Sequence, residues 1–231
     1  SAGVRNWVPV LAVAAIAALV IISGLVLWQR SRQAGLAERS FATGQRLLAQ
    51  GRDDEAIVAY RSALAHNPRS TSTRTALGLA LVEAGHFAEG ATYLADVVRA
   101  DSHSGPAWFG LAKVAQAEGR KEEARQHFRR SLAGEWPGAE EARRRRARLD
   151  YGVLLADLGR LNQGVAELIS LIEQSGDDPG IAGQAADAVR QVGTPEQSEE
   201  AFEILSHNFP ADPNVWLHLG NARLSAKREA R

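Results

Sequence analysis

The amino-acid sequence predicts an all-α protein in which a single transmembrane helix precedes an α-solenoid of stacked helix pairs. Three observations support this fold class. A run of 22 residues near the N-terminus, Trp7–Trp28, carries no ionisable side chain. After it, small residues recur at intervals of 34 along the chain. The composition is rich in Ala, Leu, Arg and Glu, which favour helices, and poor in the β-branched runs and tight-turn pairs of strands.

The apolar run is long enough to cross a bilayer. As a helix it would measure about 33 Å, against a hydrocarbon core of about 30 Å. Twelve of its residues are Val, Leu or Ile, and each of these favours insertion. Trp7 and Trp28 stand at its two ends, where tryptophan is typical of the membrane–water boundary. We therefore expect a span at about 7–28, within an N-terminal segment of 1–30, with these tryptophans as membrane anchors.

Two alternatives concern this segment. A cleaved secretory signal would have a shorter apolar core and a small-residue cleavage site, whereas this run is followed by WQRSRQ. Two features point to opposite sides of the membrane for the C-terminal part of the chain. The positive residues Arg30 and Arg32 after the span slightly favour a cytoplasmic C-terminal part, while short-tailed bacterial anchors commonly export theirs. We expect the bacterial inner membrane, with the C-terminal part periplasmic and the cytoplasm as the alternative.

The overall charge gives no indication of a nucleic-acid partner, and we expect none. Lys plus Arg equal Asp plus Glu at 27 each, so the net charge of zero gives no electrostatic reason to expect nucleic acid. The chain has no cysteine, which excludes disulfides, zinc–thiolate sites and c-type haem attachment.

The recurrence at 34 residues predicts repeated pairs of antiparallel helices. Small residues allow the first helix of each pair to approach its neighbour: Gly44, Gly78, Ala112, Gly152, Ala186, Gly220. Glycines seven residues later suit the turn inside each pair: Gly51, Gly85, Gly119, Gly159, Gly193. One pair cannot bury its own apolar face, so the pairs should stack into a superhelix.

These repeats resemble the tetratricopeptide-repeat (TPR) family, in its membrane-anchored bacterial type. The segments WFGLA at 108–112, WLHLG at 216–220, AIVAY at 56–60 and ARQHF at 124–128 match the family pattern. The resemblance implies a short linker at 31–36 and a TPR domain at 37–231. Its repeats would cover about 37–70, 71–104, 105–144, 145–178 and 179–212, with a partial or capping repeat at 213–231. Gly90, Gly164 and Ser198 replace the alanine of the pattern, which should lower local stability.

The fourth repeat carries six additional residues, because Ala112 and Gly152 are 40 apart instead of 34. The surplus predicts a lengthened first helix that begins near Pro137. Its arginines could meet an anionic partner such as acidic protein or lipid headgroups: Arg143, Arg144, Arg145, Arg146, Arg148. The alternative is a solvated helix end in which Glu140 and Glu141 pair with arginines four residues later.

A TPR stack implies a concave groove lined by one face of each first helix. By resemblance, the groove-facing positions would include Phe41, Gln45, Leu48, Thr75, Leu79, Val82, Phe109, Lys113, Gln116, Leu149, Val153, Asp187, Arg190, Leu217 and Asn221. The apolar members among them would suit an amphipathic helix or an extended apolar peptide. The alternative is that some of these residues belong to the core, displaced by one step in register.

No pattern of residues predicts catalysis. The six histidines fall at different positions of the repeat, and no two have the spacing of a metal-binding helix. The glycine-containing segments follow no strand, so they do not predict phosphate or dinucleotide sites. We therefore expect no enzyme, no cofactor, no metal and no small-molecule substrate.

Three functions fit these observations. The first is a membrane-anchored scaffold or accessory subunit that mediates protein–protein interactions within an integral membrane complex. The second is a membrane-anchored periplasmic chaperone or assembly factor, of the translocation or cytochrome-maturation type, that binds clients transiently. The third and weakest is a regulator or tether for envelope polysaccharide or pilus machinery. In each case the anchor would raise the effective concentration of the groove near its partner.

Overall fold

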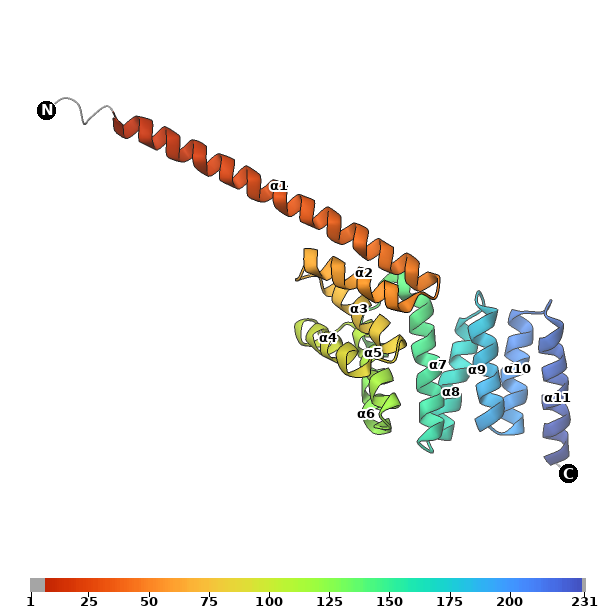
Figure 1. Ribbon diagram of the computed structural model, residues 1–231. Helices are drawn as coiled ribbons and strands as arrows, with labels where there is room; N and C mark the ends of the chain where they lie inside the picture. Colours follow the sequence, from red (N-terminus) through yellow and green to blue (C-terminus); the bar gives the residue numbers. More distant parts are fainter. Residues whose placement is uncertain (1–6, 230–231) are drawn as a thin grey trace. The chain divides into compact units, whose positions relative to one another are not determined.

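The computed structural model describes residues 7–229, and helices account for nearly all of them (Figure 1). The chain divides into two compact units, 1–84 and 85–231. The first contains α1 (Trp7–Ala49), α2 (Asp53–His66) and α3 (Thr71–Glu83). The second contains the helices from α4 onwards. The expected all-α fold, with a long apolar helix before a series of helix pairs, is confirmed.

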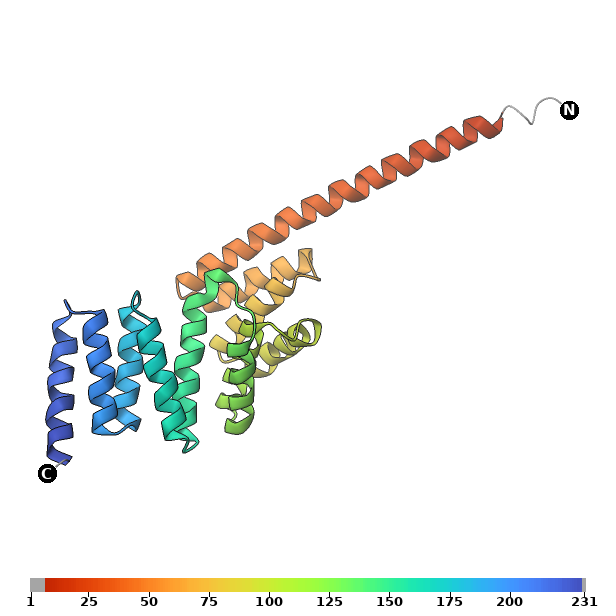
Figure 2. The same ribbon diagram turned by 180° about the vertical axis from the view of Figure 1, so that it is seen from behind.

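A single helix of 43 residues, α1, begins the first unit. Its C-terminal part packs against α2, whereas its N-terminal part extends well past α2 without a neighbouring helix (Figures 1 and 2). The apolar residues of this projecting part are exposed, with values that include 65% for Leu11 and 61% for Ile22. The first repeat therefore uses the end of the apolar helix as its own first helix.

The segment 31–36, expected as a short linker, is helical throughout. Its sequence SRQAGL contains several strong helix formers and only one glycine, Gly35. A helix that is already formed on both sides continues through such a segment at little cost, since propagation needs no new nucleus.

The second unit is a series of helices that pack against their neighbours in sequence (Figures 1 and 2). It consists of α4 (Phe87–Ala100), α5 (Gly105–Ala117), α6 (Lys121–Ala133), the 3₁₀ helix η1 (Gly138–Glu140), α7 (Glu141–Asp157), α8 (Leu161–Gln174), α9 (Pro179–Val192), α10 (Pro195–Asn208) and α11 (Pro213–Glu229). Together with α1–α3, these helices give the expected five helix pairs and one further first helix. The boundaries proposed for individual domains and repeats stay predictions.

The fourth repeat has a longer first helix, as expected, although the additional length in the α-helix is four residues and not six. The first helix α7 has 17 residues, against 13 in α5. Pro137 precedes η1 and lies four residues before α7 begins. The chain before it, at Glu135, runs beside the start of α5, where Gly105 N–H donates to Glu135 O at 2.9 Å. Pro137 lacks a backbone N–H and favours extended backbone in the residue before it, so the helix starts only after this proline.

Most turns inside the pairs use the predicted glycine. Gly51, Gly85, Gly119 and Gly159 all have positive φ, between 70° and 83°, a region that disfavours any side chain. Gly193 differs, with φ −89°. There, Thr194 caps α10 through a capping box with Gln197, and Pro195 occupies the first turn. This turn is therefore set by the start of the second helix.

Glycines inside the pairs hold the helices close together, as expected. A Cβ on Gly44 would lie 2.6 Å from the Tyr60 ring, and one on Gly152 would lie 2.8 Å from Leu168. Gly164 of α8 faces Gly152 of α7. A Cβ added to Gly164 would lie 2.6 Å from the Gly152 carbonyl oxygen. The replacement of alanine by Gly164 therefore has a packing reason that the repeat pattern alone did not show.

The core of the second unit is continuous from α7 to α11. It contains fully buried side chains such as Leu168, Ile172 and Phe202, joined by Val215 and Leu219 of the last helix. Towards the start of the same unit, Phe128 is also fully buried and its ring lies 6.2 Å from those of Phe109 and Tyr151. Each layer of helices thus supplies one aromatic or long aliphatic side chain to the space before the next layer.

Candidate partner-binding site

The apolar residues expected to line the groove are mostly buried. Leu79, Val82, Phe109 and Leu149 are 3%, 7%, 6% and 5% exposed. Phe109 packs against Phe128 and also lies 6.3 Å from the Trp136 ring, and Leu149 belongs to the core of the second unit. Their burial favours the alternative that these four residues belong to the core, and a role in partner binding stays a prediction for them.

The other expected groove residues have more accessible positions. Phe41 and Leu48 of α1 are half-buried, and the Phe41 ring lies 5.6 Å from that of Tyr60. Val153 is half-buried on α7, and Leu217 and Asn221 of α11 are exposed. Whether they bind a partner stays a prediction.

A row of polar side chains crosses the first helices of the second unit. Lys113 of α5 donates from Nζ to Asp150 Oδ2 of α7 at 3.0 Å. Arg146 of α7 donates from Nε to Asp150 Oδ1 at 3.1 Å, and from one terminal nitrogen to Gln184 Oε1 of α9 at 3.0 Å. We call these residues, with Asp187, Arg190 and His218, the polar row.

The polar row continues to the last helix. Arg190 pairs with Asp187 at 3.1 Å on α9, and His218 Nδ1 of α11 lies 3.7 Å from Asp187 Oδ1. Lys113, Asp187 and Arg190 were placed at the groove from sequence, but Asp150, Gln184 and His218 were missed. A signal was available: Asp187 and His218 are 31 apart, and Lys113 and Asp150 are 37 apart, which is 31 plus the six additional residues.

A polar cavity of about 640 Å³ adjoins this row, between α9, α10 and α11. Its lining includes Arg190, Thr194, Ser198, His218, Asn221 and Ser225. Ser198 is 5% exposed, and its hydroxyl has no hydrogen-bond partner among the described residues.

The arginines of α7 pair with acidic and amide groups of the same unit. Arg143 pairs with Glu140 at 3.0 Å, Arg145 with Asp177 at 2.9 Å, and Arg148 donates to Gln174 Oε1 at 2.6 Å. Arg144 lies 3.8 Å from Glu141, and Arg146 belongs to the polar row. The Arg145 guanidinium lowers the pKa of the Asp177 carboxyl through its hydrogen bond. Of the expected pairs four residues apart, Arg145 lies 3.9 Å from Glu141, whereas Glu140 pairs with the arginine three residues later. An anionic partner stays a prediction.

The projecting half of α1 meets the requirements of a membrane span by length and composition. Its most apolar window has a mean hydropathy of 2.7, and no part of that window is buried. A signal sequence near an N-terminus would meet the same requirements. Trp28 is 61% exposed, and the guanidinium carbon of Arg32 lies 5.5 Å from its ring centroid. Trp7 is the first residue of α1, and its side chain lies outside the described part of the chain.

Within residues 7–229, no group of three His, Cys, Asp or Glu side chains could hold a metal ion. His127 packs against the Trp108 ring at 5.2 Å, and burial lowers the pKa of its imidazole.

Trp108 donates from Nε1 to Ser102 O at 2.8 Å, and Trp216 makes the equivalent bond to Pro210 O at 2.9 Å. The two tryptophans of the repeat motif thus fasten the turn before their helix.

Residues 75–140 match the family model described as tetratricopeptide repeat. No curated protein has a sequence that matches this chain. Among solved structures, a thermophilic TPR protein from Thermus thermophilus is 18% identical, with a TM-score of 0.59 over 81% of this chain and 99% of that one. The fold is that of a TPR solenoid.

Two further solved structures extend the likeness. The Pseudomonas aeruginosa protein PilF is 15% identical, with a TM-score of 0.61 over 85% of this chain and 92% of that one. PilW, a widely conserved type IV pilus biogenesis factor, is 13% identical, with a TM-score of 0.61 over 84% and 90%. These matches support the TPR family, whose fold is typically a non-catalytic scaffold that binds peptide or protein partners.

Proposed function

We propose that this chain is a membrane-anchored TPR scaffold that mediates protein–protein interactions within an integral membrane complex. The observation that carries the proposal is the continuity of α1, because one helix supplies both the exposed apolar segment and the first half of the first repeat. An exposed apolar surface on all sides of a helix is stable in lipid and costly in water. The anchor would therefore hold the first repeat directly at the membrane.

The polar row and its cavity favour a polar partner segment over the apolar one expected from sequence. Both signs of charge are present, with Lys113, Arg146 and Arg190 beside Asp150 and Asp187. A partner with charged side chains can exchange these internal pairs for pairs of its own. The amide of Asn221, an exposed residue of the cavity lining, would then hydrogen-bond one polar side chain of the partner.

Confinement to the membrane explains why a scaffold of this kind would carry an anchor. Partner and groove would meet in two dimensions at a fixed height, which raises their effective concentration without any new contact. A helical connection preserves that advantage better than a flexible tether, since it restricts the first repeat to a narrow range of positions.

The first experiment on this proposal is a native gel of membranes solubilised in mild detergent, followed by mass spectrometry of the band that contains this chain. We expect one large complex of fixed stoichiometry. A small species with many substoichiometric partners would contradict the scaffold and favour the transient assembly factor.

A pair of variants tests the groove in the same gel. Arg190→Glu reverses a charge that lies in both the polar row and the cavity, so it should release the partner. Arg129→Glu makes the same charge change at an exposed position of α6, a second helix, and should leave the complex intact. Equal loss in both variants would show that the effect is not specific to the groove.

We further propose that the repeats lie on the periplasmic side of the bacterial inner membrane. Because the chain has no cysteine, one introduced thiol reports its own location. Arg99→Cys is suited to this purpose, since the Arg99 side chain is 75% exposed. A membrane-impermeant maleimide should label it in intact cells with a permeable outer membrane. Labelling only after the inner membrane is opened would place the repeats in the cytoplasm.

The second candidate function is a membrane-anchored assembly factor. It is favoured by the similar fold of PilW, a type IV pilus biogenesis factor. Such a factor would use the same cavity but exchange its clients, so the native gel separates the two functions by the stoichiometry of the band.

A further inference from the structure

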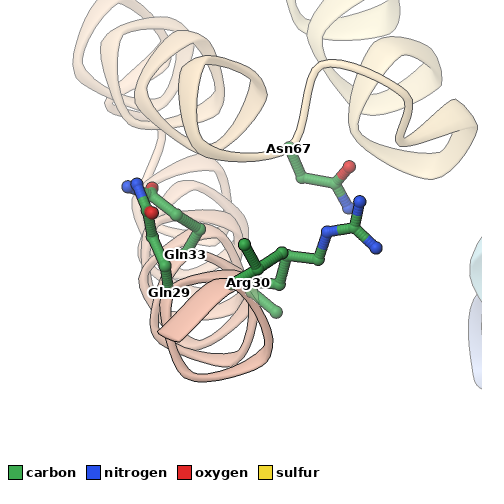
Figure 3. A pocket seen from close by; sticks show the side chains of 6 residues that line it. Gln29, Arg30, Gln33 and Asn67 are labelled. Carbon is green, nitrogen blue, oxygen red and sulfur yellow. The ribbon is translucent and has the colours of Figure 1, made fainter. Parts of the chain in front are cut away.

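A cavity of about 470 Å³ lies where the apolar part of α1 ends, and its lining comes only from the first unit. α1 contributes Val26, Gln29, Arg30, Gln33 and Ala34, and the turn after α2 contributes Asn67. Figure 3 shows the Arg30 guanidinium extending from α1 towards Asn67, with the Gln29 and Gln33 side chains on the adjoining face of the helix. This cavity, defined by these six residues, is called the collar site below.

Arg30 brings an uncompensated positive charge to the collar site. Among the described residues it has no acidic partner and no hydrogen bond, unlike Arg52 or Arg120, which pair with glutamates. The sequence offers it none nearby on α1, because the first acidic residue of the chain is Glu38. The site is therefore suited to an anion.

The amides of the collar site supply hydrogen-bond donors for that anion. His66 Nδ1 lies 2.7 Å from Gln33 Oε1, and because a carbonyl oxygen only accepts, the histidine nitrogen donates. The Gln33 amide NH₂ group is consequently left to donate elsewhere, as are those of Gln29 and Asn67. A guanidinium and amide donors that line the same cavity match the oxygens of a phosphate.

The part of the collar site nearest the apolar segment of α1 is itself apolar. Val26 is 42% exposed, while its neighbours Leu25 and Leu27 are 59% and 65% exposed. Val26, one turn before Arg30 on the membrane side, gives the cavity an apolar wall that a free, fully hydrated anion would not use. A ligand with a charged head and an apolar part would use both.

The height of the collar site decides among such ligands. Arg30 and Gln33 follow Trp28 by two and five residues, which places them about 3 Å and about 8 Å beyond the tryptophan along the helix. The polar headgroup layer on each face of a bilayer is about 5–8 Å thick. If the apolar half of α1 spans the membrane, the two side chains lie in this layer.

We propose that the collar site binds the phosphate of an anionic phospholipid headgroup, with Arg30 as its cation and the amides of Gln29, Gln33 and Asn67 as donors. The acyl chains would leave along Val26 and the apolar part of α1. The bound lipid would hold the turn after α2 against the membrane surface and so fix the first repeat there. The inference rests on the proposed membrane span and adds a lipid partner to it.

Native mass spectrometry of the full chain tests this inference. The chain is reconstituted in nanodiscs of phosphatidylcholine with one fifth phosphatidylglycerol and released into the gas phase. We expect one retained phosphatidylglycerol per chain. Arg30→Gln should lower its retention roughly tenfold or more, the size expected for the loss of hydrogen bonds to a charged group. Asn67→Asp, which places a carboxylate beside Arg30, should lower it as well.

Arg32→Gln is the matched control. It removes the same charge two residues away, at nearly the same height, from a side chain that lies over Trp28 and outside the collar site. Retention should stay at the wild-type level in this variant. Equal losses of lipid retention in Arg30→Gln and Arg32→Gln would show that the lipid is held by general charge attraction and not by the collar site. That result would overturn the inference.

Inorganic phosphate distinguishes the two possible sources of the anion. Titrated into the chain in neutral detergent at constant ionic strength, phosphate should displace the bound lipid only weakly, because it lacks the apolar part. Displacement at concentrations that match the lipid's own affinity would make this a site for a free anion instead.

Failure of the inference and failure of the anchor remain distinguishable. Resistance of the membrane-bound chain to extraction by alkaline carbonate reports the span alone. A chain that resists extraction but retains phosphatidylglycerol equally in all variants would overturn the collar site and leave the anchor intact. A chain that carbonate extracts would overturn the anchor itself.

Discussion

Gly152 and Gly164 bring α7 and α8 closer together than side chains at these positions would permit. A Cβ on Gly164 would meet backbone atoms of α7, the Gly152 oxygen at 2.6 Å and the Ala156 nitrogen at 3.0 Å. Backbone cannot move aside as a flexible side chain can. The repeat pattern prefers alanine at position 164, so single-residue packing overrides it here.

Gly164→Ala should therefore destabilise the chain by about 1–3 kcal/mol, the usual cost of overpacking. The measurement is denaturant unfolding of the full chain in detergent. Gly183→Ala is its control, since Gly183 lies within α9 and a Cβ there meets nothing within 4 Å. This substitution should stabilise by up to about 1 kcal/mol, the difference in helix propensity. Stabilisation by both variants would contradict the close approach of α7 and α8.

His127 gives stability a dependence on pH. Burial lowers the pKa of its imidazole, Arg130 and Arg120 lower it further, and Glu123 partly opposes them. As pH falls below about 6.5, His127 becomes protonated in the unfolded chain while it stays neutral in the folded chain. The free energy of unfolding therefore decreases. This contribution is complete above that pH and is lost progressively down to the lowered pKa.

His127→Gln should remove this part of the pH dependence. The urea midpoint of the wild type should drop between about pH 7.5 and about pH 5, and the drop should be smaller in the variant. An identical drop in both proteins would show that other groups carry the effect.

At the scale of the element, the sequence predicted the repeated helices well because small residues and turn glycines carry the 34-residue period directly. It gave 31–36 only as a short linker, because a change from apolar to more polar composition resembles a boundary, although it leaves helix propensity unchanged. It also predicted too long a first helix in the fourth repeat, since the length of an insertion does not reveal its conformation at Pro137.

The continuity of α1 predicts slow hydrogen exchange through 31–36. In the full chain held in detergent, amides of this segment should exchange far more slowly than those of an unstructured peptide, because helical hydrogen bonds protect them. Gly35→Pro should raise the exchange rate of this segment, since proline removes one bond and crowds another. Rapid exchange in the wild type would contradict the helical continuity of α1 through 31–36.

For the whole molecule, the positions of the first helices were predictable, but the chemistry of the expected groove was not. Register places residues such as Phe109 and Lys113 on one helix face, but only the packing of the neighbouring helices decides which are covered. Phe109 is covered by Phe128 and Trp136, while Lys113 pairs with Asp150. The partner inferred from structure is therefore more polar than the one inferred from sequence.

The same limit applies to the collar site. The sequence shows an arginine shortly after an apolar run, which is common beside membrane spans. It does not show that Asn67, 37 residues later, faces that arginine across a cavity. Only the return of α2 alongside α1 brings the two together.

The most direct test of the central claim is the intact mass of the chain in carbonate-washed membranes. The account predicts that the chain stays in the membrane pellet and that its mass still includes Trp7–Trp28. A shorter chain in the soluble fraction, cut after this segment, would identify a signal sequence and contradict the anchor.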